Sequence, residues 1–440
     1  MEKFLIEGGL PCSGRVSPAG SKNEALPTIA TALLSSAPVT LHNVPKIQDV
    51  LVMLDVVTSL GAGVKWIGDH SVVIDAGELS TARLDPDLCR KIRASILFAG
   101  PVVGRLGEVI LPPPGGDVIG RRRVDTHLNG FASLGASVSV AGSYRLAAPE
   151  GGLKGADIFF DEQSVTATEN LVTAAATARG TTVLRNVAME PHVQGVCRML
   201  RAMGAQIDGI GTPTLTIEGR GGEPLSGCEH TIGPDYLEIG SLVGLAAVTG
   251  GEMTIEGVRA DDLRMVRLVF DRIGVKTELH LPADGKGNEA TAELFVPGRQ
   301  KLRIKPDYLG HIPKIDDAPW PAFPTDLMSV AIVVATQSEG TSLFFEKMFE
   351  GRMFFVDHLI AMGAQVILCD PHRVVVVGPS PLYAATHESP DIRAGMALLL
   401  AASCARGKST ILNIRQIDRG YERMDEKLRG LGMAITRVPA

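Results

Sequence analysis

A dipeptide of an apolar residue followed by glycine recurs along the 440-residue chain, and this repeat limits the possible folds more than any other feature. Each copy follows a run of apolar residues with helical periodicity and precedes an alternating strand, so we expect the glycine to end a helix in the left-handed conformation. The spacing between copies is about 70 residues, with a longer gap before the fifth. The copies are Leu60-Gly61-Ala62, Leu134-Gly135-Ala136, Met203-Gly204-Ala205, Ile273-Gly274-Val275, Met362-Gly363-Ala364 and Leu431-Gly432-Met433.

A second helix, rich in alanine and other small apolar residues, is expected upstream of each glycine. The expected ranges are 22–36, 93–105, 164–180, 236–250, 326–340 and 392–407. A short strand follows each of them, so the repeated unit is helix, strand, helix, strand, strand. Helices that are apolar on most faces are normally buried. We therefore expect these helices in the interior, with the sheets packed around them.

These repeats predict an α/β fold of two inside-out α/β domains, each built from three repeated helix-strand-helix-strand-strand units. A chain of 440 residues is longer than one hydrophobic core usually supports. The first domain is expected at 21–232. The second is expected to combine 1–20 with 233–440, because the strand near Phe4 can pair with strands of the last repeat. The active site is expected in the cleft between the two domains.

The composition excludes several classes of function. The formal charge is -6, with 45% apolar and 21% charged residues, so there is no basic excess for nucleic acid. No apolar stretch approaches the roughly 20 residues of a membrane span, and the start resembles no secretion signal. The cysteines are scattered singly, as reduced thiols in a cytoplasmic protein would be, and predict neither a metal nor a cofactor. A solenoid used for binding remains the alternative architecture.

Polar residues stand at five of the expected helix starts, namely Lys22, Arg93, Ser164, Asp326 and Arg393. A helix N-terminus presents unpaired N–H groups and a partial positive charge, which suits a polyanionic ligand. A cation placed there is unfavourable for the helix dipole, so these positions predict a compensating anion. Simple capping of the helix is the alternative for each residue.

Three further segments combine charge with unusual backbone. The loop at 111–123 holds proline and glycine clusters, the single carboxylate Asp117 and three arginines, which predicts a mobile, anion-seeking loop or a solvated charge run. Asp326 follows a proline-rich approach and is either a base or an N-cap. The segment 418–423 is dense in charge directly after a strand, and surface ion pairs explain it nearly as well as a binding role.

At these residues the sequence resembles the enolpyruvyl transferase family, in its UDP-N-acetylglucosamine branch rather than its shikimate-phosphate branch. The resemblance covers essentially the whole chain and implies the two-domain inside-out fold. Its motifs are Ser21-Lys22-Asn23, Arg93-Ala94-Ser95, Gly115-Gly116 to Gly120, Val124-Asp125 with His127, Phe323-Pro324-Thr325-Asp326, Phe349-Glu350 with Arg352, and Ile417-Asp418-Arg419-Gly420-Tyr421-Glu422-Arg423.

The resemblance implies transfer of the enolpyruvyl group of phosphoenolpyruvate to the 3-hydroxyl of UDP-N-acetylglucosamine by addition and elimination, which releases phosphate and begins peptidoglycan synthesis. The implied catalytic residues are Lys22, Asp117, Asp326 and Arg419. Asp326 is the implied general base. Asp117 is the implied proton donor and stands where most members have cysteine, which implies insensitivity to fosfomycin, an alkylator of that thiolate.

Substrate contacts are implied for a larger set of residues. They are Lys22, Asn23, Arg93, Arg122, Arg123, Val124, Asp125, Thr126, Glu162, Gln163, Ser164, Val165, Asp326, Met348, Arg352 and Arg393. The residues at 123, 162, 236, 351 and 416 depart from the usual family pattern, so a related transferase for another nucleotide or nucleotide sugar stays open. So does a non-catalytic UDP-sugar-binding protein, although such a protein needs no proton donor. The sequence does not predict an oligomeric state.

Overall fold

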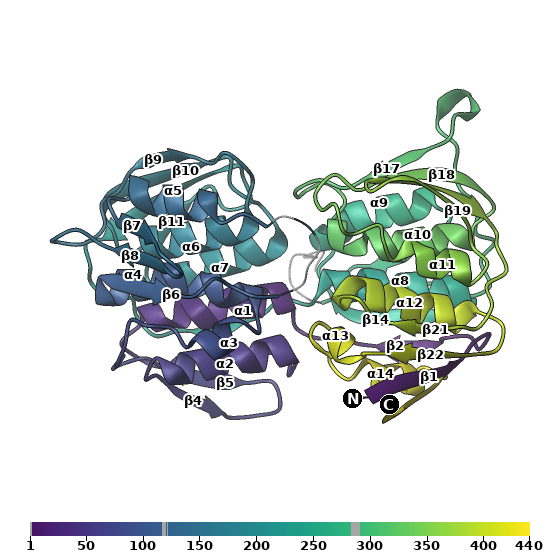
Figure 1. Cartoon of the computed structure of the whole chain (residues 1–440), viewed down its shortest axis with the longest axis horizontal. Helices are drawn as coiled ribbons and strands as arrows, with labels where there is room; N and C mark the ends of the chain where they lie inside the picture. The colour runs from purple at the N-terminus through teal and green to yellow at the C-terminus, as the bar shows by residue number, and fades with distance from the viewer. Residues whose placement is uncertain (1, 117–119, 121, 283–290) are drawn as a thin grey trace. The chain divides into compact units, whose positions relative to one another are not determined.

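The structure is a computed structural model that describes residues 2–116, 120, 122–282 and 291–440. Its contacts divide the chain into two compact units (Figure 1). The first unit contains residues 20–116 and 122–233. The second contains residues 2–19, 120, 234–282 and 291–440. The second unit is therefore discontinuous in sequence, and it includes the first strand of the chain.

Each unit is built around three inner helices, which are the small-residue helices expected from the sequence. Every residue of α10 is buried, as are nearly all residues of α8 and α12, and within each unit the inner helices pack on one another. The inner helices are α1 (Lys22–Thr31), η2 (Arg93–Phe98) continued by α4 (Ala99–Leu106), α6 (Val165–Ala175), α8 (Tyr236–Thr249), η5 (Thr325–Leu327) continued by α10 (Met328–Thr336), and α12 (Ile392–Cys404). No helix in the described ranges has the length and apolar character needed to cross a membrane.

Each repeat also has an outer helix that ends at one of the predicted glycines. The φ angles of the six glycines lie between 88° and 105°, so the predicted left-handed ends are confirmed. A residue with a Cβ at such a position costs about 1 kcal/mol or more. The outer helices are α2 (Gln48–Ser59), α5 (Asp125–Ser133), α7 (Pro191–Ala202), α9 (Arg264–Arg272), α11 (Val356–Ala361) and α14 (Met424–Gly430). Short helices elsewhere are η1 (Ala32–Leu34), α3 (Pro86–Cys89), η3 (Asp261–Leu263), η4 (Tyr308–Gly310) and α13 (Arg415–Asp418).

The sheets lie outside the inner helices, as expected for an inside-out fold. In the first unit their strand orders are β13-β3-β5-β4, β6-β8-β7 and β11-β12-β10-β9. The strands are β3 (Val39–His42), β4 (Gly63–Trp66), β5 (Val72–Asp75), β6 (Glu108–Leu111), β7 (Ser137–Val140), β8 (Tyr144–Ala147), β9 (Asp157–Phe159), β10 (Arg179–Arg185), β11 (Gln206–Asp208), β12 (Thr214–Arg220) and β13 (Glu229–Thr231).

In the second unit the strand orders are β15-β16-β14-β2, β17-β18-β20-β19 and β21-β22-β1-β23. The strands are β1 (Glu2–Glu7), β2 (Gly14–Val16), β14 (Met253–Val258), β15 (Glu278–His280), β16 (Ala292–Val296), β17 (Lys314–Asp316), β18 (Gly340–Phe345), β19 (Gln365–Asp370), β20 (Arg373–Gly378), β21 (Thr386–Glu388), β22 (Lys408–Leu412) and β23 (Ala434–Pro439).

The last repeat departs from the predicted unit, because it has one strand of its own after α14 instead of two. Strand β1 lies between β22 and β23, antiparallel to both, in the position that β20 holds between β18 and β19. The proposed pairing of the first strand with the last repeat is therefore confirmed, with Phe4 opposite both Ile411 and Arg437. The two ends of the chain lie side by side in this sheet (Figure 1).

Candidate active site

Lys22 is the first residue of α1 and is buried. Its Nζ lies 2.7 Å from Oδ2 of Asp49, which is buried near the start of α2. Removing one partner of a buried ion pair typically costs about 3–5 kcal/mol. Asp49 therefore supplies one anion beside this cation, and the binding of an anionic ligand by Lys22 stays a prediction. Asn23, the next residue, is half-buried on the same helix turn.

Arg93 is the first residue of η2, and its side chain binds the backbone of the segment just before α5. Its Nη2 donates to the carbonyl oxygens of Arg122 and Arg123, at 2.7 and 3.3 Å. Burial lowers the pKa of Arg93. Arg123 itself is exposed and pairs with Asp125, its Nε 2.7 Å from Oδ2. The structure thus brings Arg93 to the 122–123 backbone. Asp117, in the predicted mobile loop, lies outside the described residues.

The residues at the start of α6 form a second group of predicted contact residues in the first unit. Ser164 is the N-cap of α6, and its Oγ accepts from the backbone N–H of Ala167 at 3.4 Å, so capping is a real role of this residue. Thr126, near the start of α5, donates to Oδ1 of Asp161 at 2.6 Å. The hydrogen bond links 122–126 to the segment that contains Glu162, Gln163, Ser164 and Val165. These predicted contact residues are half-buried or exposed, apart from the buried Thr126.

His127 is a buried residue that strengthens this link. Its Nδ1 accepts from the amide of Asn170 at 2.9 Å, so the proton is on Nε2, which donates to Oγ1 of Thr166 at 3.0 Å. Burial, and then the nearby charge of Arg93, lower the pKa of His127 to about 3. The imidazole is therefore neutral at physiological pH and acts as a fixed hydrogen-bonded spacer between α5 and α6.

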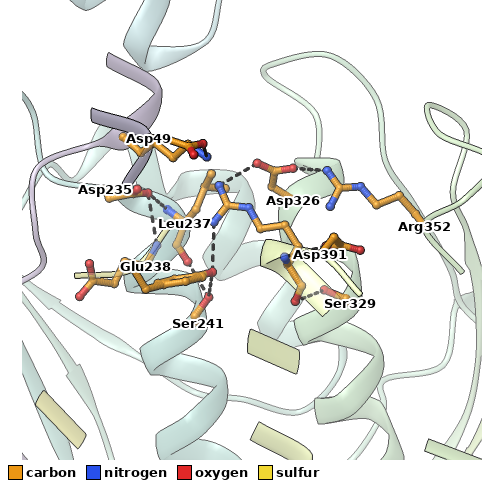
Figure 2. A network of polar contacts seen from close by, with 12 residues as sticks. Asp49, Asp235, Leu237, Glu238, Ser241, Asp326, Ser329, Arg352 and Asp391 are labelled. Atoms are coloured by element: carbon orange, nitrogen blue, oxygen red, sulfur yellow. Dashed lines mark hydrogen bonds and ion pairs between the residues drawn. The ribbon is translucent and has the colours of Figure 1, made fainter. Parts of the chain in front are cut away.

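In the second unit, Asp326 lies in η5 between two arginines. Its Oδ1 is 2.5 Å from Nη2 of Arg352, and its Oδ2 is 2.9 Å from Nη2 of Arg393. Figure 2 shows the side chains of Asp326 and Arg352 pointing toward each other. Pro324 occupies the cap position of η5, so the alternative in which Asp326 is a simple N-cap is wrong. The carboxylate is 21% exposed, which leaves one side open to solvent.

Arg393 connects the starts of all three inner helices of the second unit. Its Nη1 donates to the Tyr421 hydroxyl at 3.1 Å, and that hydroxyl lies 3.2 Å from Oγ of Ser241 on α8. Burial by itself would lower the pKa of Arg393, but Asp326, Tyr421 and Asp235 raise it above its usual range. Arg393 is thus a permanent cation inside the protein, and its partners are protein groups.

The remaining predicted residues lie on the turn after β18 and on α13. The backbone N–H of Met348 donates to Oε1 of Glu346 at 3.1 Å. The Arg352 guanidinium lies 5.6 Å from the centre of the Phe349 ring. Arg419 follows α13, is half-buried, and donates from Nη1 to Oε1 of Gln416 at 2.9 Å.

Sequence reasoning missed the groups that hold these side chains. Asp49 forms an ion pair with Lys22. A buried carboxyl pair, Glu346 and Asp317, lies next to the segment that carries Asp326. A signal for Asp49 exists, since it is the single acid at the start of an otherwise apolar helix run. Tyr421 lies in the motif at 417–423, but the sequence predicted no role for this residue. Across the described ranges, no group of His, Cys, Asp and Glu side chains is arranged to hold a metal ion.

Comparison with known proteins shows which family the chain belongs to. The family model for EPSP synthase (3-phosphoshikimate 1-carboxyvinyltransferase) matches residues 6–428. A UDP-N-acetylglucosamine 1-carboxyvinyltransferase of Bradyrhizobium diazoefficiens is 53% identical over 437 residues, with 99% of this chain and 98% of the relative covered. The protein of the same name from Treponema denticola is 51% identical, with 99% of each chain covered.

Solved structures give the same result for the fold. The enolpyruvyl transferase NikO from Streptomyces tendae superimposes with a TM-score of 0.85 at 26% identity, covering 100% of this chain and 99% of that one. EPSP synthase from Acinetobacter baumannii has a TM-score of 0.76 at 17% identity with both chains fully covered, which supports the fold alone. From the family match, the identity to these relatives and the shared inside-out fold, the chain belongs to the EPSP synthase (3-phosphoshikimate 1-carboxyvinyltransferase) family of enolpyruvyl transferases.

Proposed function

We propose that the protein transfers the enolpyruvyl group of phosphoenolpyruvate to the 3-hydroxyl of UDP-N-acetylglucosamine and releases phosphate, the first committed step of peptidoglycan synthesis. The observation that carries this proposal is the identity of about half, over the full length of both chains, to several relatives named for that reaction. The second unit adds a supporting observation, because two arginines fix the position of a partly open carboxylate, and a general base must be held within reach of the hydroxyl that it deprotonates.

The proposed reaction assigns a role to each charged group. Asp326 accepts the proton of the sugar hydroxyl as its oxygen bonds to C2 of phosphoenolpyruvate. Asp117 gives a proton to the methylene carbon, and the C–O bond to phosphate then breaks while the methyl group returns a proton. Lys22, Arg122 and Arg419 hold the phosphate and carboxylate, because fixed cations stabilise the charge that develops there. No cofactor or metal enters any step.

The remaining predicted residues bind the nucleotide sugar in this proposal. Hydroxyl and amide groups at the start of α6, with Thr126, suit the uracil and ribose, and the 122–123 backbone is fixed by Arg93 for the diphosphate. We propose that substrates contact residues of both units. We also propose that the units are the two domains predicted at 21–232 and at 1–20 with 233–440. The cytoplasm is the proposed compartment, since both substrates are phosphorylated molecules that do not cross membranes unaided.

The first test is turnover with phosphoenolpyruvate and UDP-N-acetylglucosamine, followed by phosphate release and by the mass of the nucleotide product. The expected product is the enolpyruvyl ether. Binding of both substrates without phosphate release would contradict the proposal. The same assay would then be made with other nucleotide sugars.

Asp117 has a separate test, made with two variants of the same residue. Asp117→Asn is expected to abolish turnover and to retain UDP-sugar binding, because an amide cannot donate the proton. Asp117→Cys is expected to become sensitive to time-dependent inactivation by fosfomycin, whereas the wild type is not. Near-normal turnover of Asp117→Asn would remove this residue from the mechanism.

A further inference from the structure

Two carboxyl groups, those of Glu346 and Asp317, are buried together in the second unit. They lie next to the segment that carries Asp326. Glu346 follows β18 and Asp317 follows β17, and these strands pair in parallel with Asp316 opposite Phe345. Both side chains are 0% exposed. The pair is 29 residues apart in sequence, and the sheet brings it together.

Glu346 accepts hydrogen bonds from two different segments. The Thr325 hydroxyl lies 3.0 Å from Oε1 and 2.9 Å from Oε2. The backbone N–H groups of Met348 and Phe349 donate to Oε1, each at 3.1 Å. Asp317 holds the same turn, since its Oδ1 accepts from the N–H of Lys347 at 2.6 Å. The pair therefore fastens the turn 346–349 to the start of η5.

One proton between the two carboxyl groups accounts for this geometry. Oδ2 of Asp317 is buried and has no hydrogen-bond donor among the described residues, and a proton on Glu346 would give Asp317 one. Burial, and then Asp317, raise the pKa of Glu346 to about 9. Glu346 is thus a neutral acid at physiological pH and donates to Asp317, and two buried carboxylates side by side are avoided.

We infer that Glu346 and Asp317 form a proton-sharing pair that positions the general base Asp326. Thr325 is the residue before Asp326, so its bond to Glu346 fixes the backbone that carries the base. The turn 346–349 leads directly to Arg352, which holds Oδ1 of Asp326. Both the backbone and one counter-ion of the base therefore depend on Glu346. The inference deepens the proposed function and depends on it for the role of Asp326.

Other charged groups around the pair form their bonds elsewhere, while Nε of Arg352 is buried without a hydrogen-bond partner in the described part of the chain. Arg352 faces Glu346 and favours its ionised form, but its Nη2 bonds to Asp326. His372, on the turn between β19 and β20, uses Nδ1 on the Glu346 carbonyl oxygen at 2.8 Å, not on the carboxyl group. Lys347 points its ammonium group to Asp316. Loss of the shared proton would therefore separate Glu346 from Asp317 and loosen the turn.

The test compares Glu346→Gln and Asp317→Asn with the wild type in kcat and KM as functions of pH. A glutamine amide imitates the protonated acid, because it donates to Asp317 and still accepts from Thr325. We expect Glu346→Gln to keep kcat at pH 7 within about threefold and to lose a fall in kcat that the wild type shows above about pH 9. Asp317→Asn is expected to lose the same fall. KM of Glu346→Gln for the UDP-sugar at pH 7 is expected to change little, since the amide keeps an acceptor for the N–H of Met348 and so keeps the turn in place.

A matched control is Glu238→Gln, which changes another buried carboxylate of the second unit, paired with Lys427 on α14. It is expected to lower stability and to keep the alkaline fall in kcat of the wild type. The inference is overturned if Glu346→Gln keeps that fall, or if Glu238→Gln removes it as well. In either case the pair would be a structural element only.

Thermal unfolding gives a readout that needs no turnover. The folded pKa of Glu346 is above its unfolded value of about 4.5, so its stabilising effect is complete below pH 4.5 and is lost as the pH rises toward 9. Between pH 6 and 8.5, Tm of the wild type should fall more steeply than Tm of Glu346→Gln. Equal slopes would reject the shared proton. A wild type without turnover would reject the proposed function, and this measurement would still decide on the pair.

Discussion

The helix starts of the two units use their charges in different ways. In the first unit each charge is held separately, Lys22 by Asp49 of the same repeat and Arg93 by backbone carbonyl oxygens. In the second unit Asp326 and Arg393 hold each other across two repeats, and Tyr421 extends the network to the third. A change in the first unit should therefore stay local, whereas a change in the second should spread to all three helix starts.

The largest effect is expected from Asp326→Asn, which removes the base and also the negative charge between two arginines. Turnover should fall by about 100-fold to 10,000-fold. The free energy of unfolding should fall by about 3–5 kcal/mol, because two buried cations then face each other. Phosphate release and urea unfolding measure the two effects. A loss of activity without a loss of stability would show that the second unit is not a closed network.

Arg393→Met and Arg93→Met form a matched pair that tests the comparison directly. Arg393→Met should lower the free energy of unfolding by about 3–5 kcal/mol, because Asp326 and the Tyr421 hydroxyl lose a buried partner. Arg93→Met leaves only carbonyl oxygens unpaired and should cost about 1–3 kcal/mol. Urea unfolding of both variants measures the two losses in free energy of unfolding. Equal losses would contradict the difference between the units.

A double-mutant cycle on Lys22 and Asp49 should show that coupling in the first unit stays within one pair. Lys22→Met and Asp49→Asn are expected to couple by about 0.5–3 kcal/mol in unfolding free energy. Lys22→Met combined with Arg93→Met should be additive within about 0.5 kcal/mol. Coupling between the two cations would mean that the first unit also contains a network.

The effect that is smallest at neutral pH concerns His127 and the pH dependence of stability. The folded pKa of His127 is about 3, below its unfolded value of about 6.5, so protonation favours the unfolded chain as the pH falls from 6.5 toward 3. His127→Gln should make Tm less sensitive to pH in this acid range. This change in pH dependence comes from the binding of one proton, to the His127 imidazole in the first unit. An unchanged acid slope would show that His127 already binds a proton in the fold.

The repeat pattern predicted most of the architecture, because its signals are local. Glycine marks the helix ends for backbone reasons, and small apolar residues mark the inner helices because only these are buried on all sides. The same reasoning located Lys22, Arg93 and Arg393 at helix starts. It did not show that the sixth repeat lacks a strand, since no local signal in 408–439 reveals that β1 replaces it.

The partners of the site residues could not be predicted, because they come from distant segments. Asp317 meets Glu346 only through the parallel pairing of β17 and β18. Asp49 meets Lys22 through the packing of α1 on α2, and although Asp49 stands out as an acid at the start of an apolar helix run, the sequence does not show which cation it meets. For the same reason the sequence predicted an anionic ligand at Lys22 but not the protein carboxylate beside it.

The position of β1 between β22 and β23 has a consequence for synthesis on the ribosome. The strand is made about 400 residues before either of its partners, so it must wait unpaired while both units between them are translated. The first unit can complete its own sheets once β13 has emerged, well before that moment. The nascent chain therefore carries an unpaired strand edge until β22 and β23 emerge, and such an edge is a site where strands of other chains can pair.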